Sequence, residues 1–417
     1  MGNFRSAVQM CAVVAVVVAA LCCSAIDGAA ATKFVFSTCK KGFEKLLKHE
    51  VQLNYPDLKF AYSRPGLITW KVDSNSTDTG STAEFVWKPN NLVFMRSRGE
   101  SITATANSSS DVMTIAARIQ SISRTTDKLR LHVFAREIEE SCFRTDHPLE
   151  VAERRERTSS LRNEILAADE GAVVFHTDEP AEDDDLVVDV CIGEGSDRIF
   201  MGQHIHSSQC RGSSHPNNLF PHLALPAEAP SRAYLKIEEA IRYFDIPMQR
   251  GDQAIEIGSA PGGSAYNLLG RGLRVWGVDP CPSDRTHSPV VRRHQGFTEI
   301  ISKLHRLQLE QLPTTVQWIL CDANISPEEA IPHLKKLCTA YSTRNCLKGL
   351  LYTCKLNDEV FSWSPDRILR YLHETRAALL STVDEGGERR VFRAVEMVAV
   401  PSNKQEVLLY AVADSVR

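Results

Sequence analysis

Four charged residues, far apart in the chain, have the types and positions that proton transfer requires. Asp322 ends the apolar segment VQWILCD, Lys355 ends GLLYTCK, Glu406 begins EVLLYAV, and Lys236 lies in SRAYLKIEEAIRYFDI. A lysine that lies near a second cation in a partly dry cleft loses basicity, so it can accept a proton from a hydroxyl near neutral pH. The carboxylates would orient the two amines. Each residue alone is typical of a solvated strand end, but their joint occurrence at the ends of strands indicates a site.

A glycine-rich turn precedes these residues in the chain. The segment EIGSAPGGSAYNLLG, residues 256–270, predicts the end of a strand, a turn that lets the backbone approach a ligand, and a helix. The turn lacks a Walker lysine and does not have the spacing of the dinucleotide fingerprint. Asp279 ends the next strand, 23 residues after Glu256, where a carboxylate can accept both hydroxyls of a ribose. The pattern favours S-adenosylmethionine, while a nucleotide cofactor and a purely structural turn stay open.

The elements that must position these residues alternate between strand and helix over residues 226–417. Ser231 is the expected N-cap of the first helix. The last two predicted strands follow each other without a helix. This order predicts an α/β domain with a mostly parallel sheet, helices on both faces and a C-terminal β-hairpin, and ligands bind such sheets at the carboxyl ends of the strands. The expected strands are QAIEIG, LRVWGVDP, VVRRHQ, VQWILCDA, GLLYTCKL, VFRAVEMVAV and EVLLYAVA, and the later helices begin at Gly263, Thr298, Ser326 and Ser364.

The chain before residue 226 has a different composition. Residues 33–145 predict a small α+β unit, with strands at KFVFSTC, LITWKV, EFVWK and LRLHVFARE and a helix at KGFEKLLKHEVQLNY. Residues 146–225 predict an acidic linker, which includes DEPAEDDD, and an intermediate unit that contains the strand pair LVVDVCIG and RIFMGQHI. Trp70 and Trp87 are expected in the core. His204, His206 and Cys210 are expected at a strand edge and loop rather than around a metal, because no second ligand pair accompanies them.

The first 31 residues are expected to be a targeting leader. Arg5 is followed by an uncharged segment, residues 6–26, that ends in small residues, as in a secretory signal peptide. A signal anchor, an organelle-targeting signal and a misassigned start are the alternatives. Nine cysteines lie beyond the leader, an odd number without a pattern, which favours reduced thiols. The expected location is therefore an organelle (plastid or mitochondrion) or the endomembrane system, with the cytoplasm as the alternative and no stable membrane contact after leader removal.

The motif IGSAPGG, followed by a strand-end acid and the set Lys236, Asp322, Lys355 and Glu406 in that order, resembles the FtsJ-like ribose 2′-O-methyltransferases and their Lys-Asp-Lys-Glu tetrad. More narrowly, SRPGLITWK, PAEAPSRAYLKIEEA and CKLN resemble segments of the RlmM-type 23S ribosomal RNA methyltransferases. The resemblance implies a Rossmann-like domain that uses S-adenosylmethionine and no metal. It also implies a ferredoxin-like or THUMP-like RNA-binding region before that domain, and methylation of a cytidine ribose in large-subunit RNA.

The resemblance also assigns roles to residues of this chain. Lys355 would be the base that deprotonates the 2′-hydroxyl, and Lys236, Asp322 and Glu406 would position it and tune its pKa. Gln295 stands where the family tends to carry an acid after the third strand to contact the adenine. Glu256 stands where many relatives have aspartate. The expected cofactor-binding residues are Glu256, Gly258, Ser259, Ala260, Pro261, Gly262, Gly263, Asp279, Gln295 and Asp322.

The sequence leaves alternatives for the partner and the reaction. A formal charge of −4 over 417 residues neither indicates nor excludes an RNA partner, so any RNA-binding surface must be local. Methyl transfer to another acceptor and an inactive RNA-binding or ribosome-assembly factor stay open as functions. The intact tetrad favours an enzyme. The sequence does not specify the oligomeric state.

Overall fold

The computed structural model describes residues 33–72, 87, 92–105, 109–123, 129–136, 148–168, 180–193, 199–210, 214–218, 223–280, 286–402 and 405–414. The expected leader, residues 1–31, lies outside the described residues. So do most of the expected strand EFVWK and part of the acidic segment DEPAEDDD. No helix within the described ranges is long and apolar enough to cross a membrane.

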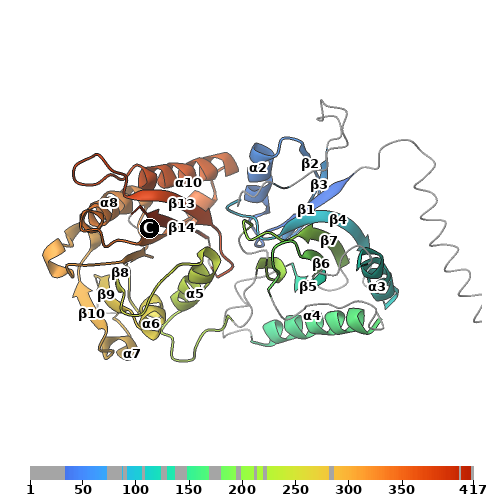
Figure 1. Ribbon diagram of the computed structural model, residues 1–417, viewed down its shortest axis with the longest axis horizontal. Helices are drawn as coiled ribbons and strands as arrows, with labels where there is room; N and C mark the ends of the chain where they lie inside the picture. The colour runs from blue at the N-terminus through green and yellow to red at the C-terminus, as the bar shows by residue number, and fades with distance from the viewer. Residues whose placement is uncertain are drawn as a thin grey trace, which may run out of the picture.

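The amino-terminal part of the chain is built on one seven-stranded sheet (Figure 1), in the order β2-β3-β1-β4-β7-β6-β5. Its neighbouring strands pair antiparallel except β5 and β6, which are parallel. The strands are β1 (Phe34–Thr38), β2 (Leu58–Arg64), β3 (Leu67–Val72), β4 (Arg98–Thr105), β5 (Leu129–Ala135), β6 (Leu186–Ile192) and β7 (Ile199–Ile205), and the helices are α2 (Glu44–Asn54), α3 (Ser109–Ser123) and α4 (Pro148–Ala168).

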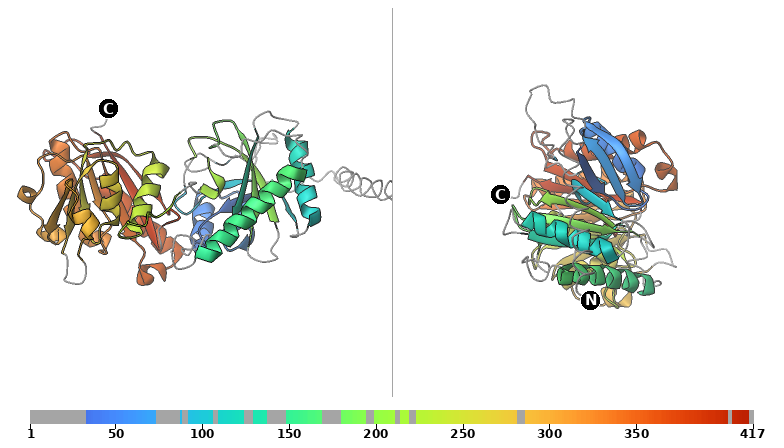
Figure 2. Two further views of the ribbon diagram at one scale, coloured as in Figure 1. Left: turned by 90° about the horizontal axis from the view of Figure 1, so that it is seen from below. Right: turned by 90° about the vertical axis from the view of Figure 1, so that its right-hand side faces the viewer.

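Strands β6 and β7 form the pair expected from the sequence, but they belong to the same sheet as the strands of residues 33–145. Strand β7 pairs with β4 and β6 pairs with β5. The expected boundary between residues 145 and 146 therefore falls within one sheet. The sequence did not reveal this, because strand partners so distant in the chain leave no local signal. The helix α4 also occupies much of the expected linker. Its position between β5 and β6 makes it the crossover that two parallel neighbours need (Figure 2).

Alternating residues along the strands divide this sheet into two faces. Val188 and Val190 of β6 are buried in the cluster that includes Ile115 of α3 and Ile165 of α4. The opposite face carries Asp189, together with the aromatic pair Phe36 and Phe200, whose ring centroids lie 5.4 Å apart. Trp70 is fully buried, as expected, and its indole donates to the Ser37 hydroxyl at 3.0 Å.

The carboxyl-terminal part contains the second seven-stranded sheet, in the order β10-β9-β8-β11-β12-β14-β13. The pairs from β10 to β12 are parallel, and β14 pairs antiparallel with both β12 and β13. Its strands are β8 (Gln253–Ile257), β9 (Arg274–Asp279), β10 (Phe297–Ile301), β11 (Trp318–Cys321), β12 (Gly349–Lys355), β13 (Phe392–Val398) and β14 (Glu406–Ala413).

Helices cover both faces of this second sheet (Figure 1). Leu334 and Leu372, on two helices of one face, share a buried cluster with strand residues, and Ile241 and Leu268, on two helices of the other face, share a second one. The first face carries α8 (Pro327–Thr343) and α10 (Pro365–Leu380), the second carries α5 (Ala233–Phe244) and α6 (Gly263–Gly270), and α7 (Pro289–Arg292) and α9 (Asp358–Phe361) are single turns.

Most of the expected elements of this sheet are present, but two predictions are wrong. The segment VVRRHQ contains the helix α7, since Pro289 with its fixed φ occupies the first turn after Ser288. The segment that begins at Thr298 is strand β10 rather than a helix, as its β-branched residues favour. At α5 the N-cap position is Arg232, although the Ser231 hydroxyl still accepts from the Ala233 amide at 3.3 Å.

The two sheets are joined by buried contacts. Phe43, next to α2, packs edge to face against Phe361 of α9, with ring centroids 5.6 Å apart, and also stacks on Phe94 at 5.4 Å. The Ala399 amide donates to the Val93 carbonyl at 2.8 Å. These contacts hold the amino-terminal sheet against the domain that carries the tetrad.

The described cysteines are free thiols, and most of them are buried in the two cores. Burial raises the pKa of the Cys321 and Cys354 thiols to about 12, so these residues are inert at neutral pH. The buried thiols are Cys39, Cys191, Cys321, Cys338 and Cys354, and the partly exposed ones are Cys210 and Cys346.

Candidate active site

The four expected catalytic residues meet at one edge of the second sheet. Asp322 directly follows β11 and Lys355 is the last residue of β12, so both lie at the carboxyl ends of parallel neighbours. Glu406 is the first residue of β14, which runs antiparallel to β12, so its amino end reaches the same edge. Lys236 comes from α5, the helix that enters the domain. The topology therefore brings together side chains that are up to 170 positions apart (406 − 236).

Each of the two amines contacts both carboxylates. Lys236 Nζ lies 3.2 Å from Asp322 Oδ2 and 2.6 Å from Glu406 Oε2. Lys355 Nζ donates to Asp322 Oδ1 and, at 2.7 Å, to Glu406 Oε1. The result is a closed ring of two cations and two anions with no net charge. All four side chains are between 12% and 17% exposed, so the ring is largely desolvated but still open to the surface.

The electrostatics of Lys355 differ from the sequence-based expectation. Burial lowers the pKa of this amine, but the adjacent carboxylates of Asp322 and Glu406 outweigh burial and raise the pKa above its ordinary value. Burial raises the pKa of Asp322, and the two ammonium groups reverse this and hold it below its ordinary value. The expectation that Lys355 loses basicity is therefore wrong, because both carboxylates contact the amine. Two anions in direct contact have a larger effect than one nearby cation.

The glycine turn follows β8 and lies beside this ring. Gly258 adopts a φ of +79°, and a Cβ atom there would lie 2.6 Å from the Cα of Ala323, the residue after Asp322. Gly262 has a φ of +106° at the N-cap position of α6, where a Cβ would lie 2.9 Å from Val291. Both positions require glycine, because an L-residue disfavours this backbone and the space is filled. The turn therefore packs closely against the end of β11, next to Asp322.

Glu256 is buried beneath the turn. Ser259 donates to its Oε2 at 2.8 Å, and Ser264 in the first turn of α6 bonds to it as well. Burial raises the pKa of this carboxyl to about 8, although the two serine hydroxyls lower it. Glu256 is therefore mostly protonated at neutral pH, and it lies inside the turn as a neutral group. The sequence-based prediction did not include Ser264, although a small polar residue in the first turn after the glycines is a usable signal.

Asp279 lies at the carboxyl end of β9, next to the turn. The Ala260 amide donates to its Oδ2 at 3.2 Å, and the Gly258 amide donates to the Val278 carbonyl at 2.9 Å. The remaining turn residues, Pro261 and Gly263, lead into α6. Asp279, the turn and Asp322 thus share one edge of the sheet, where the sequence predicted a cofactor site.

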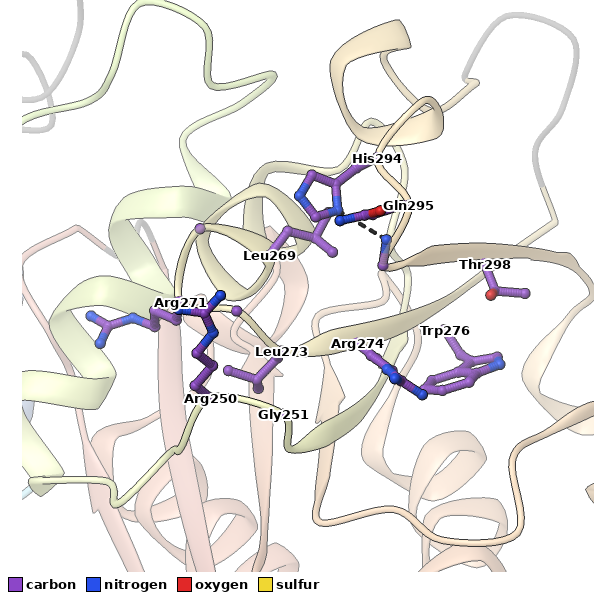
Figure 3. A pocket seen from close by; sticks show the side chains of 13 residues that line it. Arg250, Gly251, Leu269, Arg271, Leu273, Arg274, Trp276, His294, Gln295 and Thr298 are labelled. Carbon is purple, nitrogen blue, oxygen red and sulfur yellow. Dashed lines mark hydrogen bonds between the residues drawn. The ribbon is translucent and has the colours of Figure 1, made fainter.

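Gln295 is the exception, because it lies at the opposite edge of the sheet. It precedes β10, and the parallel register pairs Ile301, not Gln295, with Asp279. Gln295 instead lines a hollow at the amino ends of the strands (Figure 3). The prediction that it contacts the adenine is wrong, because it assumed a strand before this residue. The backbone that does reach Asp279 is at Ser302, whose amide donates to the Asp279 carbonyl at 3.1 Å.

His204, His206 and Cys210, which the sequence analysis expected at a strand edge and loop, lie among other side chains. His204 Nδ1 lies 2.7 Å from Asp189 Oδ2, and the thiol of Cys210 accepts from Arg98 at 2.8 Å. Burial lowers the pKa of His206. Across the described part of the chain, no group of three or more histidine, cysteine or acidic residues is arranged to hold a metal ion.

The residues at the carboxyl edge fit S-adenosylmethionine. The turn offers backbone and small side chains and contains no lysine or arginine between residues 256 and 263, so it suits a nucleoside without phosphate. A carboxylate at the position of Asp279 can accept the hydroxyls of a ribose, and the carboxylates of Asp322 and Glu406 are of the charge that attracts a sulfonium.

Comparison with known proteins agrees with this geometry. The FtsJ-like methyltransferase family model matches residues 229–371. The Ribosomal RNA large subunit methyltransferase M of Histophilus somni (strain 2336) is 48% identical over 65 residues, which are 14% of this chain and 18% of that protein. Proteins of the same name from Photorhabdus asymbiotica and Shewanella amazonensis are 33% identical over 122 residues and 28% identical over 161 residues.

These similarities cover parts of the proteins concerned. The matched segments are 26% and 35% of this chain for the Photorhabdus and Shewanella relatives, and they span 31% and 41% of the relatives' own lengths. The solved structure of TrmN from Thermus thermophilus aligns with 91% of this chain and 99% of that chain, at 14% identity and a TM-score of 0.31.

Proposed function

We propose that this chain, in which residues 229–371 form an FtsJ-like methyltransferase domain, is an S-adenosylmethionine-dependent RNA ribose 2′-O-methyltransferase. The observation that carries the proposal is the ring in which Lys236 and Lys355 each contact both Asp322 and Glu406. S-adenosylmethionine supplies an activated methyl group when it is bound. What the protein must add is alignment of the two reactants and removal of one proton from the attacking hydroxyl.

Lys355 is the group that takes this proton. It ends β12 between the two carboxylates, and a hydroxyl placed against Nζ would transfer its proton to the free electron pair of a neutral amine. Contact with the carboxylates of Asp322 and Glu406 raises the pKa of Lys355 and keeps the amine protonated. A further cation that competes for Asp322 and Glu406 lowers this pKa, so the amine becomes a base only when the site is occupied.

Lys236, Asp322 and Glu406 position that base. Glu406 is the register partner of Lys355 on the neighbouring strand, so the strand pairing fixes their separation. Asp322 bridges both amines. Lys236 compensates the second negative charge and keeps the ring neutral before a ligand enters. Removal of any one member leaves its partners charged and only partly paired in a desolvated site.

We infer that the acceptor is ribosomal RNA of the large subunit, and that the modified nucleotide is a cytidine. Support for the RNA class comes from relatives named Ribosomal RNA large subunit methyltransferase M, one of them 48% identical over 65 residues. The ribose position is favoured by the lysine-centred ring, since a 2′-hydroxyl is a weak nucleophile until it loses its proton, and the ring contains an amine that can take this proton. The cytidine rests on the resemblance alone.

We further infer that the amino-terminal sheet holds the RNA through its edge strand β2. Phe60 and Tyr62 of this strand are 47% and 45% exposed, and a bulge between them places Phe60 opposite Trp70 and Tyr62 opposite Thr69. Lys48 Nζ lies 4.0 Å from the Phe60 ring centroid, and the Arg64 guanidinium lies 5.1 Å from that of Tyr62. Exposed rings with adjacent cations are the features that stack unpaired bases and contact their phosphates.

One experiment tests the proposed function directly. The purified chain is incubated with S-adenosylmethionine labelled on its methyl group and with unmodified large-subunit ribosomal RNA, and the labelled position is mapped. We expect label on a ribose 2′-oxygen. Label on a base would show a different acceptor chemistry, and RNA binding without any label would indicate an inactive assembly factor instead.

A further inference from the structure

A hollow of about 830 Å³ lies at the amino ends of β8, β9 and β10, the edge opposite the ring of lysines and carboxylates. Arg250 precedes β8, Arg274 begins β9, and His294 precedes β10 (Figure 3). Because these strands are parallel neighbours, all three residues lie at the same edge of the sheet. Neither the glycine turn nor the tetrad contributes to the lining. The hollow is therefore separate from the candidate active site.

The charge of the hollow is positive. Three arginines line it and no aspartate or glutamate does. Arg271 is already paired, because it donates to Glu238 and Asn267. Arg250 and Arg274 are exposed, and neither forms an ion pair with any residue in the described ranges. Two guanidinium groups thus remain available to an anion.

Glycines in the backbone around the hollow let a ligand approach closely. Gly251 and Gly272 have φ values of +91° and +82°, and the Gly251 amide donates to the Gly272 carbonyl at 3.0 Å, which joins the two turns. A Cβ at Gly272 would lie 2.8 Å from Arg250 Cγ. Gly270 and Gly296 add further positions without side chains. Glycine-lined walls between arginine side chains leave room for a ligand that carries phosphate.

We propose that this hollow binds phosphate groups of the RNA backbone, as a second RNA contact remote from the methylated ribose. Strand β9 connects the two places, since Arg274 is its first residue and Asp279 its last. Five residue steps along a strand span about 17 Å, so one folded RNA segment can reach both edges. The proposal rests on the proposed function for its choice of RNA over other phosphate-bearing ligands. Guanidinium groups bind phosphate oxygens in a bidentate manner.

The test compares charge reversal at two exposed arginines of the same domain. Arg274→Glu alters the hollow, and Arg393→Glu alters the outermost strand β13 at the other end of the sheet. Affinity of the full-length chain for a fragment of large-subunit ribosomal RNA is measured by fluorescence anisotropy at several salt concentrations. We expect Arg274→Glu to weaken binding roughly tenfold and to reduce the salt slope by about 1, and Arg393→Glu to change neither. The milder double variant Arg250→Ala with Arg274→Ala should show the same trend.

Each outcome has a definite meaning. Equal RNA affinity and salt slope for Arg274→Glu and Arg393→Glu would overturn the proposal. So would binding of a nucleoside monophosphate that Arg274→Glu abolishes while RNA binding stays unchanged, because the hollow would then serve a free nucleotide. If the wild-type chain methylates no RNA and Arg274→Glu still weakens RNA binding selectively, the inference about the hollow stands and the proposed function fails.

Discussion

Lys355 and Glu406 are register partners on the antiparallel strands β12 and β14, and the ammonium of one lies 2.7 Å from a carboxylate oxygen of the other. The backbone pairing of the sheet therefore fixes a contact inside the candidate active site. Asp322, at the end of the adjacent parallel strand, completes the surroundings of the same amine. The fold thus positions a lysine between two anions, and its acid–base properties follow from that position.

Neutralisation of Asp322 should make Lys355 less basic. The Asp322 carboxylate is the largest of the contributions that raise the pKa of Lys355 in opposition to burial, so Asp322→Asn should lower that pKa. Titration of ¹³Cε-labelled lysine by NMR measures it, with Asp366→Asn as control, since Asp366 pairs with the exposed Arg370. An unchanged Lys355 titration in Asp322→Asn would show that the ring does not set the basicity of this amine.

Removal of the carboxylate at Asp279 should weaken cofactor binding. In the proposed cofactor site Asp279, at the end of β9, accepts the ribose hydroxyls, and hydrogen bonds to a charged acceptor contribute about 1.5–3 kcal/mol. We expect Asp279→Ala to raise the dissociation constant of S-adenosylmethionine by roughly tenfold to a hundredfold in calorimetry, and the exposed control Asp366→Ala to leave it unchanged. Equal constants for the two variants would remove Asp279 from the ribose site.

The buried carboxyl of Glu256 should make the stability of the ligand-free protein depend on pH. Its pKa rises from 4.5 to about 8 on folding, so the folded state holds a proton that the unfolded state releases across this range. Stability therefore falls as the pH rises from about 4.5 to 8. Glu256→Gln, which stays neutral, should melt several degrees above the wild type at pH 8.5 and close to it at pH 4.5. The exposed control Glu310→Gln should show no such trend. A stability gain for Glu256→Gln that is the same at both pH values would contradict the burial argument.

The exposed rings of β2 should contribute to RNA binding. Stacking on an aromatic side chain contributes about 1–3 kcal/mol per base, so Phe60→Ala and Tyr62→Ala should each weaken RNA binding roughly tenfold. Leu53 on α2 is 62% exposed and apolar but has no ring, so Leu53→Ala is the matched control. Filter binding at constant salt measures the affinities. If the aromatic variants bind as well as Leu53→Ala, the edge strand is not a base-stacking surface.

Sequence reasoning located the tetrad because three of its members are fixed by strand ends. An apolar segment that ends in a charged residue, as at Asp322 and Lys355, predicts a strand. It also predicts the edge of the sheet at which the charged side chain lies. The same reasoning failed at Gln295, where the short segment between β9 and β10 contains a single helical turn that Pro289 begins. The expected strand VVRRHQ ends at Gln295, whereas β10 ends at Ile301. The prediction therefore placed Gln295 at the carboxyl edge of the sheet, although it lies at the amino edge.

Two further properties depend on distances that the sequence does not contain. The pairing of β4 with β7 joins residues about 100 positions apart, and it merges two regions whose compositions differ. The pKa of Lys355 depends on whether its neighbours are cations or anions at contact distance. The sequence shows that a second lysine is present. Only the structure shows that Lys355 directly contacts both carboxylates.

The measurement that tests the central claim most directly is methyl transfer to unmodified large-subunit ribosomal RNA by Lys355→Ala, beside the exposed-lysine control Lys336→Ala. We expect Lys355→Ala to lose transfer to a 2′-oxygen by at least about a hundredfold while calorimetry shows that S-adenosylmethionine still binds, and Lys336→Ala to match the wild type. Transfer by Lys355→Ala at the wild-type rate would contradict the assignment of this amine as the base.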